Sequence, residues 1–125
     1  MRTLGQKRAE YALEKVLAIP EGKKKEDFKS FSAGAPSMIL QNGFGQALAF
    51  WLAKGTDKHI AIFDIIKNWL FYEKDDIKNS FVKKTEDRVD FIKELSGMDQ
   101  IEYLTAQKET LALLEWVKRY ANAEL

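Results

Sequence analysis

The stretch YLTAQKETLALLEWVKRYANAEL, residues 103–125, decides the fold of this chain. At about 100° per residue, its apolar side chains cover most of a helical wheel. These side chains are Tyr103, Ala106, Leu111, Leu113, Leu114, Trp116, Val117, Tyr120 and Ala121, and the polar strip between them is Lys108, Glu115 and Arg119. A helix that is apolar over so much of its surface must be buried. We therefore predict a long, largely buried C-terminal helix with the other helices packed around it.

Length and composition set further limits. A chain of 125 residues has the common size of one domain, so we predict a single domain over residues 1–125. The absence of cysteine excludes disulfides and thiol catalysis. The N-terminus lacks the apolar core of a signal peptide, and the longest apolar run, Ala47–Ala53, is far shorter than the roughly 20 residues of a membrane helix. We expect a cytoplasmic protein with no membrane partner.

Apolar side chains spaced three and four residues apart predict an opening helix. They are Ala9, Ala12, Leu13, Val16 and Ile19. Pro20 is expected to stop this helix. A short helical stretch with Phe28 and Phe31 follows, which Gly34 is expected to end or weaken. Pro36 suits the first turn of a new helix better than the middle of a continuing one.

The densest basic cluster consists of Lys23, Lys24 and Lys25, in a loop or at the start of the following segment. The whole chain has a net charge of +1, from 20 basic and 19 acidic residues, so no overall field draws it onto nucleic acid. Nucleic-acid binding would have to use a local patch of this kind. A run of lysines is also the ordinary composition of a solvated loop, and both interpretations stay open.

Asn42-Gly43 is expected to break the helix, and Phe44 begins another. The inward face of that next helix is predicted to be Ala47, Leu48, Phe50 and Trp51. A glycine link between two helices is also the layout of a DNA-binding helix-turn-helix. The would-be recognition helix, Gly45–Ala53, contains no Arg or Lys and only Gln46 to reach a base edge, which argues against that function.

Thr56 is expected to cap the next helix, with Asp57 in its first turn. Its apolar face is predicted to be His59, Ile62, Phe63, Ile65, Ile66, Trp69 and Leu70. A further helix begins at Thr85 with Glu86 and Asp87, runs through Val89, Ile92 and Leu95, and ends at Gly97. Asp99 and Glu102 read as a reciprocal cap of the last helix. No segment predicts a strand, so the fold class is all-α, a compact bundle of about six helices.

Candidate catalytic groups are few. His59 is the only histidine, and its place beside an apolar face indicates a packed, hydrogen-bonded structural residue. A metal-dependent nuclease would have to use the carboxylates of Asp64, Glu73, Asp75 and Asp76, but their spacing is not that of a calcium loop, and a solvated turn explains the last three. No serine, histidine and acid constellation can be assembled. We therefore expect a protein that binds and is not an enzyme, with no cofactor, no metal and no small-molecule substrate.

Two motifs carry a resemblance to a known family. One is the run Asn42-Gly43-Phe44-Gly45-Gln46-Ala47-Leu48-Ala49-Phe50, preceded by Pro36. The other runs from Tyr103 through Thr105 to Leu114-Glu115-Trp116-Val117-Lys118-Arg119-Tyr120-Ala121. With Arg2, Gln6, Ala9, Ala12 and Val16 of the opening helix, they resemble the small helical subunit of type III-B CRISPR effector complexes, the fifth subunit of the Cmr complex. The stretch from about Thr56 to Met98 matches poorly.

The resemblance implies a non-catalytic subunit for antiviral defence that stacks with copies of itself along an RNA-guided complex. Its partners would be the backbone and large Cmr subunits, further copies of this chain, the crRNA and the target RNA. Lysines and arginines would meet phosphates without reading bases, because pairing between guide and target selects the sequence. The alternatives are a free-standing helical DNA-binding regulator and the small subunit of a type III-A complex.

The candidate RNA-contacting residues fall into two sets. Lys54, Lys118 and Arg119 lie at motif positions, whereas Lys58, Lys23, Lys24 and Lys25 are candidates because they cluster. Arg119 has a second interpretation, because Glu115 lies one turn before it and an ordinary surface ion pair would explain both residues.

Overall fold

Six α-helices and one short hairpin make up the computed structural model, which describes residues 1–123 and 125. The helices are α1 (Leu4–Leu17), α2 (Lys23–Asn42), α3 (Phe44–Lys54), α4 (Asp57–Leu70), α5 (Arg88–Ser96) and α6 (Gln100–Asn122). The hairpin pairs β1 (Glu73–Lys74) with β2 (Ile77–Lys78) in antiparallel fashion. The predicted all-α bundle of about six helices is therefore confirmed. Within the described residues, no helix is long and apolar enough to cross a membrane.

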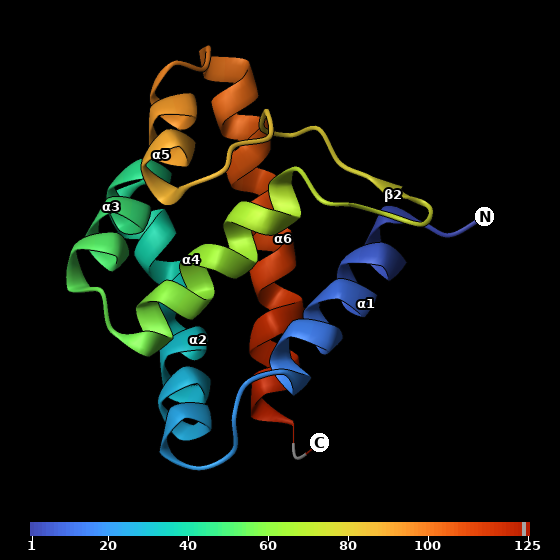
Figure 1. Cartoon of the computed structure of the whole chain (residues 1–125), viewed down its shortest axis with the longest axis vertical. Helices are drawn as coiled ribbons and strands as arrows, with labels where there is room; N and C mark the ends of the chain where they lie inside the picture. The colour runs from blue at the N-terminus through green and yellow to red at the C-terminus, as the bar shows by residue number, and fades with distance from the viewer. Residues whose placement is uncertain (124) are drawn as a thin grey trace.

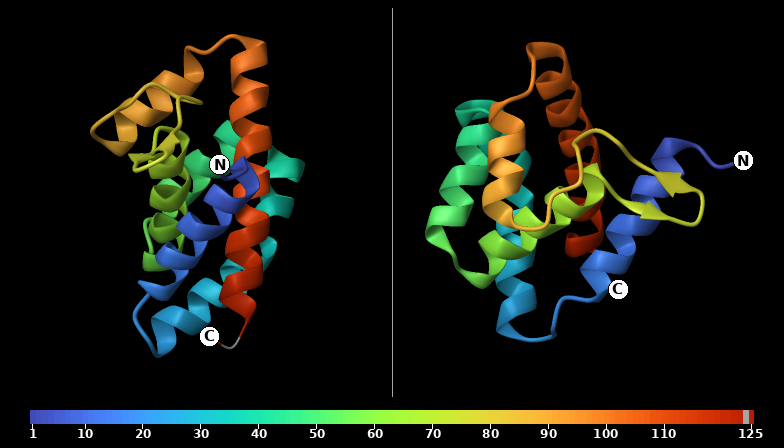
Figure 2. Two further views of the ribbon diagram at one scale, coloured as in Figure 1. Left: turned by 90° about the vertical axis from the view of Figure 1, so that its right-hand side faces the viewer. Right: turned by 45° about the horizontal axis from the view of Figure 1, so that its top comes forward.

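Helix α6 is the longest element, and α1 and α2 pack along it. In Figure 1, α4 crosses in front of α6, while α3 and α5 lie beside α4 at the left of the view. The left view of Figure 2 shows α6 running along most of the height of the molecule. Burial on α6 follows one face, spaced three and four residues apart, at Ala106, Glu109, Thr110, Leu113, Leu114, Val117 and Ala121.

The buried face of α6 is narrower than its sequence predicts. Trp116 and Tyr120 are only half-buried, and their rings stack on each other with centroids 5.6 Å apart. The most buried helix is α4, in which eight of 14 residues are buried, against seven of 23 in α6. Helix α4 owes this to its position, because it packs against α2, α3, α5 and α6. The predicted apolar face of α4 is buried throughout, from His59 to Leu70.

Helix α2 departs from the prediction, because it continues through Gly34 and Pro36 without a break. An internal proline loses one backbone hydrogen bond and clashes with the carbonyl four residues earlier, at a cost of about 3 kcal/mol. Pro36, Ala35 and Ile39 are all buried on the side of α2 that packs against α4 and α6. The burial of these side chains offsets the local cost, so the prediction of a new helix at Pro36 was wrong.

The helix ends also differ in detail. Helix α1 ends at Leu17, so Ile19 lies outside it, and Thr3 and Gln6 form a capping box that the sequence reading missed. Gly43, with a φ of 90°, separates α2 from α3 as predicted. The side chain of Asp99 accepts a hydrogen bond from the amide of Glu102 at 2.8 Å, which confirms half of the expected reciprocal cap.

Helix α5 begins later than predicted. Asp87, not Thr85, caps it and accepts from the amide of Asp90 at 2.8 Å. This later start leaves Val89 57% exposed and turns Phe91 into the core. The hairpin was missed because strands of two residues are too short to show alternation.

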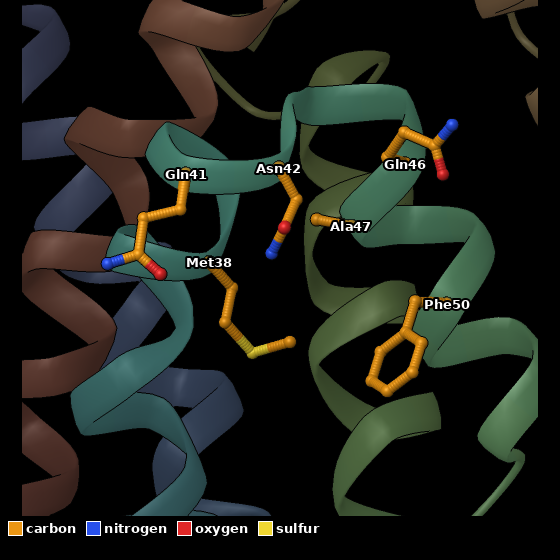
Figure 3. A pocket seen from close by; sticks show the side chains of 6 residues that line it. All are labelled: Met38, Gln41, Asn42, Gln46, Ala47 and Phe50. Carbon is orange, nitrogen blue, oxygen red and sulfur yellow. The ribbon is translucent and has the colours of Figure 1, made fainter.

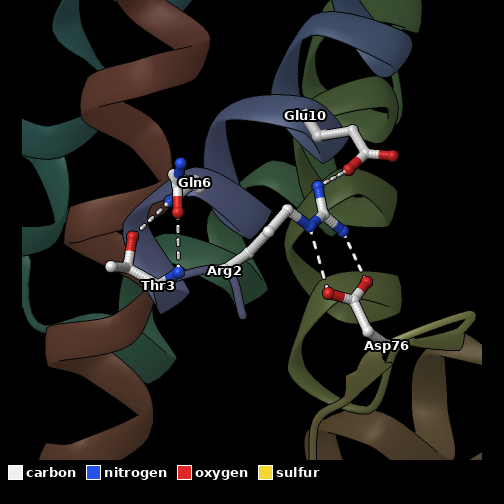
Figure 4. A network of polar contacts seen from close by, with 5 residues as sticks. All are labelled: Arg2, Thr3, Gln6, Glu10 and Asp76. Atoms are coloured by element: carbon white, nitrogen blue, oxygen red, sulfur yellow. Dashed lines mark hydrogen bonds and ion pairs between the residues drawn. The ribbon is translucent and has the colours of Figure 1, made fainter.

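The N-terminus is fastened to this hairpin. The guanidinium of Arg2 donates to both carboxylate oxygens of Asp76, at 3.0 and 2.5 Å, and to Glu10 of α1. Figure 4 shows this guanidinium lying between the two carboxylates. Both partners hold the pKa of Arg2 above its usual value, with the larger effect from the hydrogen bond to Asp76. This contact ties the hairpin to the start of α1.

Candidate nucleic-acid interface

Five of the predicted lysines lie in the first turns of α2 and α4 and at the last residue of α3. We call these five residues the basic corner: Lys23, Lys24, Lys25, Lys54 and Lys58. The three neighbouring lysines form the first turn of α2, so they belong to a helix and not to a loop. Lys24 and Lys58 line one small hollow of about 160 Å³, whose other walls include Ile19, Phe28 and Ala61. Lys24 and Lys58 thus lie at the same hollow, a proximity that the sequence did not predict.

Two of the five lysines have carboxylate partners. The ammonium of Lys24 lies 3.5 Å from Asp57, and that of Lys25 lies 3.0 Å from Glu21. Within the part of the chain that the structure describes, Lys23, Lys54 and Lys58 take part in no ion pair. Exposed ion pairs contribute about 0–1 kcal/mol each. A phosphate can therefore displace the two carboxylates at little cost.

The backbone adds to the positive field of the basic corner. Gly22, which precedes α2, has no side chain, and the side chain of Thr56, which precedes α4, caps no first-turn amide. The positive ends of both helix dipoles therefore face this corner. The hydroxyl of Thr56 lies instead 2.5 Å from Nδ1 of His59.

His59 is the structural residue that its sequence position indicated. Its side chain is 8% exposed, and its ring lies 4.6 Å from that of Phe31, centroid to centroid. Burial lowers the pKa of His59, and the charges of Lys58 and Lys54 lower it further. Among residues 1–123 and 125, no group of three His, Cys, Asp or Glu side chains is arranged to hold a metal ion.

Lys118 and Arg119 lie elsewhere, near the C-terminal end of α6. Both line a hollow of about 470 Å³ with Ala33 of α2 and with Glu115. Among the described side chains, no ion pair joins Glu115 to Arg119. In Figure 1, the end of α6, the start of α2 and the link from α3 to α4 all lie in the lower half of the molecule.

The acidic residues proposed for a nuclease do not meet. Asp64 of α4 accepts two hydrogen bonds from Arg88, both at 2.8 Å. Asp76 is bound by Arg2, and this hydrogen bond holds the pKa of Asp76 below its usual range. Each of these two carboxylates thus binds an arginine from another part of the chain. These contacts stabilise the fold and do not assemble a set of metal ligands.

One buried polar network was missed by the sequence reading. The carboxylate of Glu109 on α6 accepts from Arg8 of α1 at 2.6 and 2.8 Å, and from the indole Nε1 of Trp69 on α4 at 2.8 Å. Its hydrogen bond to Arg8 raises the pKa of that guanidinium. A signal was present, because Glu109 falls at helical spacing between Ala106 and Leu113 on the buried face. This network joins three helices.

Phe50 was wrongly assigned to the inward face of α3, since it is 48% exposed. It lines a hollow of about 570 Å³ between α2 and α3. Figure 3 shows Phe50 facing this hollow from one side and Met38 from the other. Helix α3 presents no cation before Lys54, its last residue, so the helix-turn-helix function gains no support.

Comparisons with known proteins agree with one another. A family model described as "CRISPR-associated protein (Cas_Cmr5)" matches residues 4–124. A relative named "CRISPR system Cmr subunit Cmr5", from Thermus thermophilus, is 28% identical over 123 residues, which cover 98% of this chain and 96% of the relative. The crystal structure of a CRISPR-associated Cmr5 family protein from the same organism superposes with a TM-score of 0.77 at 28% identity, covering 97% of this chain and 96% of that one.

Proposed function

The chain belongs to the CRISPR-associated Cmr5 family, and on that premise we propose that it is a non-catalytic structural subunit that contacts RNA in a Cmr effector complex. This membership confirms the resemblance to the fifth subunit of the Cmr complex. The observation that carries the proposal is the extent of the match, which includes all six helices. It also covers the stretch from Thr56 to Met98, whose sequence alone matched poorly.

The RNA contact is assigned to the basic corner, with Lys118 and Arg119 as a second group. Lysines act as point charges toward phosphates and carry no base-reading geometry. Three lysines of the corner have no ion pair among the described residues, and the other two have weak ones. The helix dipoles of α2 and α4 add to the attraction. Each contact is modest, so binding requires several of them and weakens with added salt.

The partners proposed are the backbone and large subunits of the Cmr complex, further copies of this chain, the crRNA and the target RNA. The Thermus thermophilus relative is named as a subunit of the Cmr system, which supports the protein partners. Sequence choice then belongs to pairing between guide and target, because the basic corner contacts the backbone only. Cleavage of the target RNA would then be carried out by other subunits. Within the cytoplasm the chain works as one helical domain.

Copurification tests this function. The chain is expressed with the other Cmr subunits and a crRNA, and the complex is isolated through a tag on another subunit. We expect this chain and the crRNA to be recovered together. Recovery of neither the other subunits nor RNA with this chain would contradict the proposal. A second preparation, in which Lys54 and Lys58 are both replaced by glutamate, separates protein contacts from RNA contacts, because it should still assemble.

A further inference from the structure

We infer that the hydroxyl of Tyr103 and the amide of Gly45 form a clasp that holds the first turns of α6 against the start of α3. We call the held segment the arm and define it as residues 99–105, from the N-cap of α6 onward. The clasp is a conformational device of the fold, and it depends neither on RNA binding nor on the partners of the chain.

The first argument is that α3 has no cap from its own end. Its N-cap is Gly43, which offers no side chain to the free amides of the first turn. The amide of Gly45 donates instead to the hydroxyl oxygen of Tyr103 at 2.6 Å, across 58 positions of sequence. The ring of Tyr103 meets Phe44 edge to face, with centroids 5.8 Å apart, which directs the hydroxyl toward this amide. Tyr103 therefore caps α3 from another helix.

The second argument is the close approach that Gly45 allows. Gly45 lies inside α3 and does not have a positive φ, so its backbone conformation does not require glycine. A Cβ at this position would lie 2.9 Å from the hydroxyl oxygen of Tyr103, closer than the two atoms can pack. At Gly34 of α2, by contrast, a Cβ would meet nothing within 4 Å. The missing side chain of Gly45 thus makes room for the hydroxyl.

The third argument is that the arm has little other support. Within residues 99–105, Tyr103 is the only residue that is not exposed. A hollow of about 450 Å³ lies beside it, lined by Ala49 of α3, Ile92 of α5 and Met98 of the turn before the arm. Unfilled space supplies no packing contacts between α3 and the arm. The arm lies at the top of the molecule in Figure 1, where α5 turns into α6.

The clasp determines where the arm points. Ile101 and Leu104 lie on either side of Tyr103 in the sequence and are 79% and 49% exposed. Their direction changes with the arm, so the clasp fixes it. The rival explanation is that the packing of the Tyr103 ring on Phe44 holds the arm and that the hydroxyl is incidental. The two explanations differ in what the removal of one oxygen atom does.

Urea unfolding of four full-length proteins tests the clasp: the native chain, Tyr103→Phe, Gly45→Ala and the double variant. Tyr103→Phe keeps the ring, and we expect the folding equilibrium constant to fall about two- to ten-fold, the range of one hydrogen bond. Gly45→Ala should weaken folding of the native chain, because the new Cβ displaces the hydroxyl. In the Tyr103→Phe background it should strengthen folding, because the nearest ring atom is 4.0 Å away and alanine favours a helix over glycine.

Gly34→Ala is the matched control. Its added Cβ lies in open space within a helix, so it should strengthen folding in both backgrounds. An effect of Gly45→Ala with the same sign in both backgrounds would overturn the inference.

Hydrogen exchange locates the effect of the lost hydroxyl. In Tyr103→Phe, the amides of Gly45 and of residues 102–105 should exchange faster, by a factor about two-fold or more above that for residues 106–121, because the arm opens locally. Equal or smaller acceleration at residues 102–105 would mean that the ring alone holds the arm, and it would overturn the inference.

Discussion

The two parts of α2 differ in charge and so present two different surfaces. Residues 23–29 include six charged side chains out of seven, whereas residues 30–42, the rest of the helix, include none. The first part contributes three lysines to the basic corner, and the second lines an uncharged hollow with α3. One helix therefore carries two surfaces of different chemistry, one toward each end.

This comparison depends on a rigid framework beneath both surfaces. Helix α2 packs against α6 and α4, and the network of Arg8, Trp69 and Glu109 joins those two helices to α1. The framework uses its charges differently from the basic corner. Glu109 is 5% exposed and accepts three hydrogen bonds, whereas Lys23, Lys24 and Lys54 of the corner are exposed. Buried pairs are expensive to break, and exposed pairs are easily exchanged.

The largest effect is expected from Glu109→Ala. This change leaves the indole N–H of Trp69 buried without an acceptor and leaves the guanidinium of Arg8 unpaired. Because Arg8 is partly exposed, the cost stays below that of a fully buried pair, at about 2–3 kcal/mol of unfolding free energy. Urea denaturation measures it. Glu115→Ala is the matched control on the same helix, and an equal loss in both variants would contradict the role of the network.

A smaller effect, confined to RNA binding, is expected from replacing Lys54 and Lys58 by glutamate. The double reversal should weaken RNA binding about ten-fold or more and lower the slope of log K against log salt by about 2, one for each lost contact. The stability should stay within about 0.5 kcal/mol of the native value. Titrations with labelled RNA at several salt concentrations provide the measurement.

Lys93→Glu on α5 serves as the control for this reversal, because it changes charge equally at an exposed position outside the basic corner. If Lys93→Glu lowered the slope by the same amount, RNA binding would depend on net charge. The distinction between the two parts of α2 would then carry no meaning.

Asp57→Asn is expected to have an effect of opposite sign and smaller size. It releases Lys24 from its partner, so RNA binding should strengthen by about two- to five-fold, the range that a surface ion pair allows. The loss of a carboxylate from the first turn of α4 should cost a few tenths of a kcal/mol of stability. Weaker RNA binding in this variant would show that Asp57 supports the geometry of the corner.

The smallest effect concerns pH and His59. Its pKa is lowered in the folded state, so the unfolded chain takes up the proton first as the pH falls. The associated stability is present above about pH 6.5, the unperturbed histidine value, and is lost as the pH falls toward the folded pKa. Unfolding measured from pH 7.5 to 5 should show this loss in the native protein. A His59→Gln variant should lose less stability over this pH range. Equal slopes of unfolding free energy against pH in the two proteins would contradict the assignment of this effect to His59.

Local periodicity was sufficient to predict α4 and the break at Gly43. The buried face from His59 to Leu70 follows from helical spacing, and Gly43 adopts a φ that favours glycine. The buried face of α4 and the break at Gly43 both depend on residues that are close in sequence. The expected fold class was therefore correct even where helix ends were wrong by a few residues.

The errors share a different cause, because they depend on contacts between distant segments. Pro36 remains inside α2 because its side chain is buried, and Glu109 is buried because Arg8 and Trp69 meet it. The candidate lysines could be picked out by clustering and by motif. That Lys24 and Lys58 share one hollow follows only from the packing of α2 against α4.

Hydrogen exchange tests most directly the claim that RNA contacts the charged end of α2 and not its uncharged end. Amide exchange is compared in the isolated chain and in the chain with an RNA duplex. RNA should slow exchange in the first turns of α2 and α4 and leave residues 38–50 unchanged. Slower exchange of residues 38–50 with RNA alone, or no RNA effect at the two first turns, would contradict the claim.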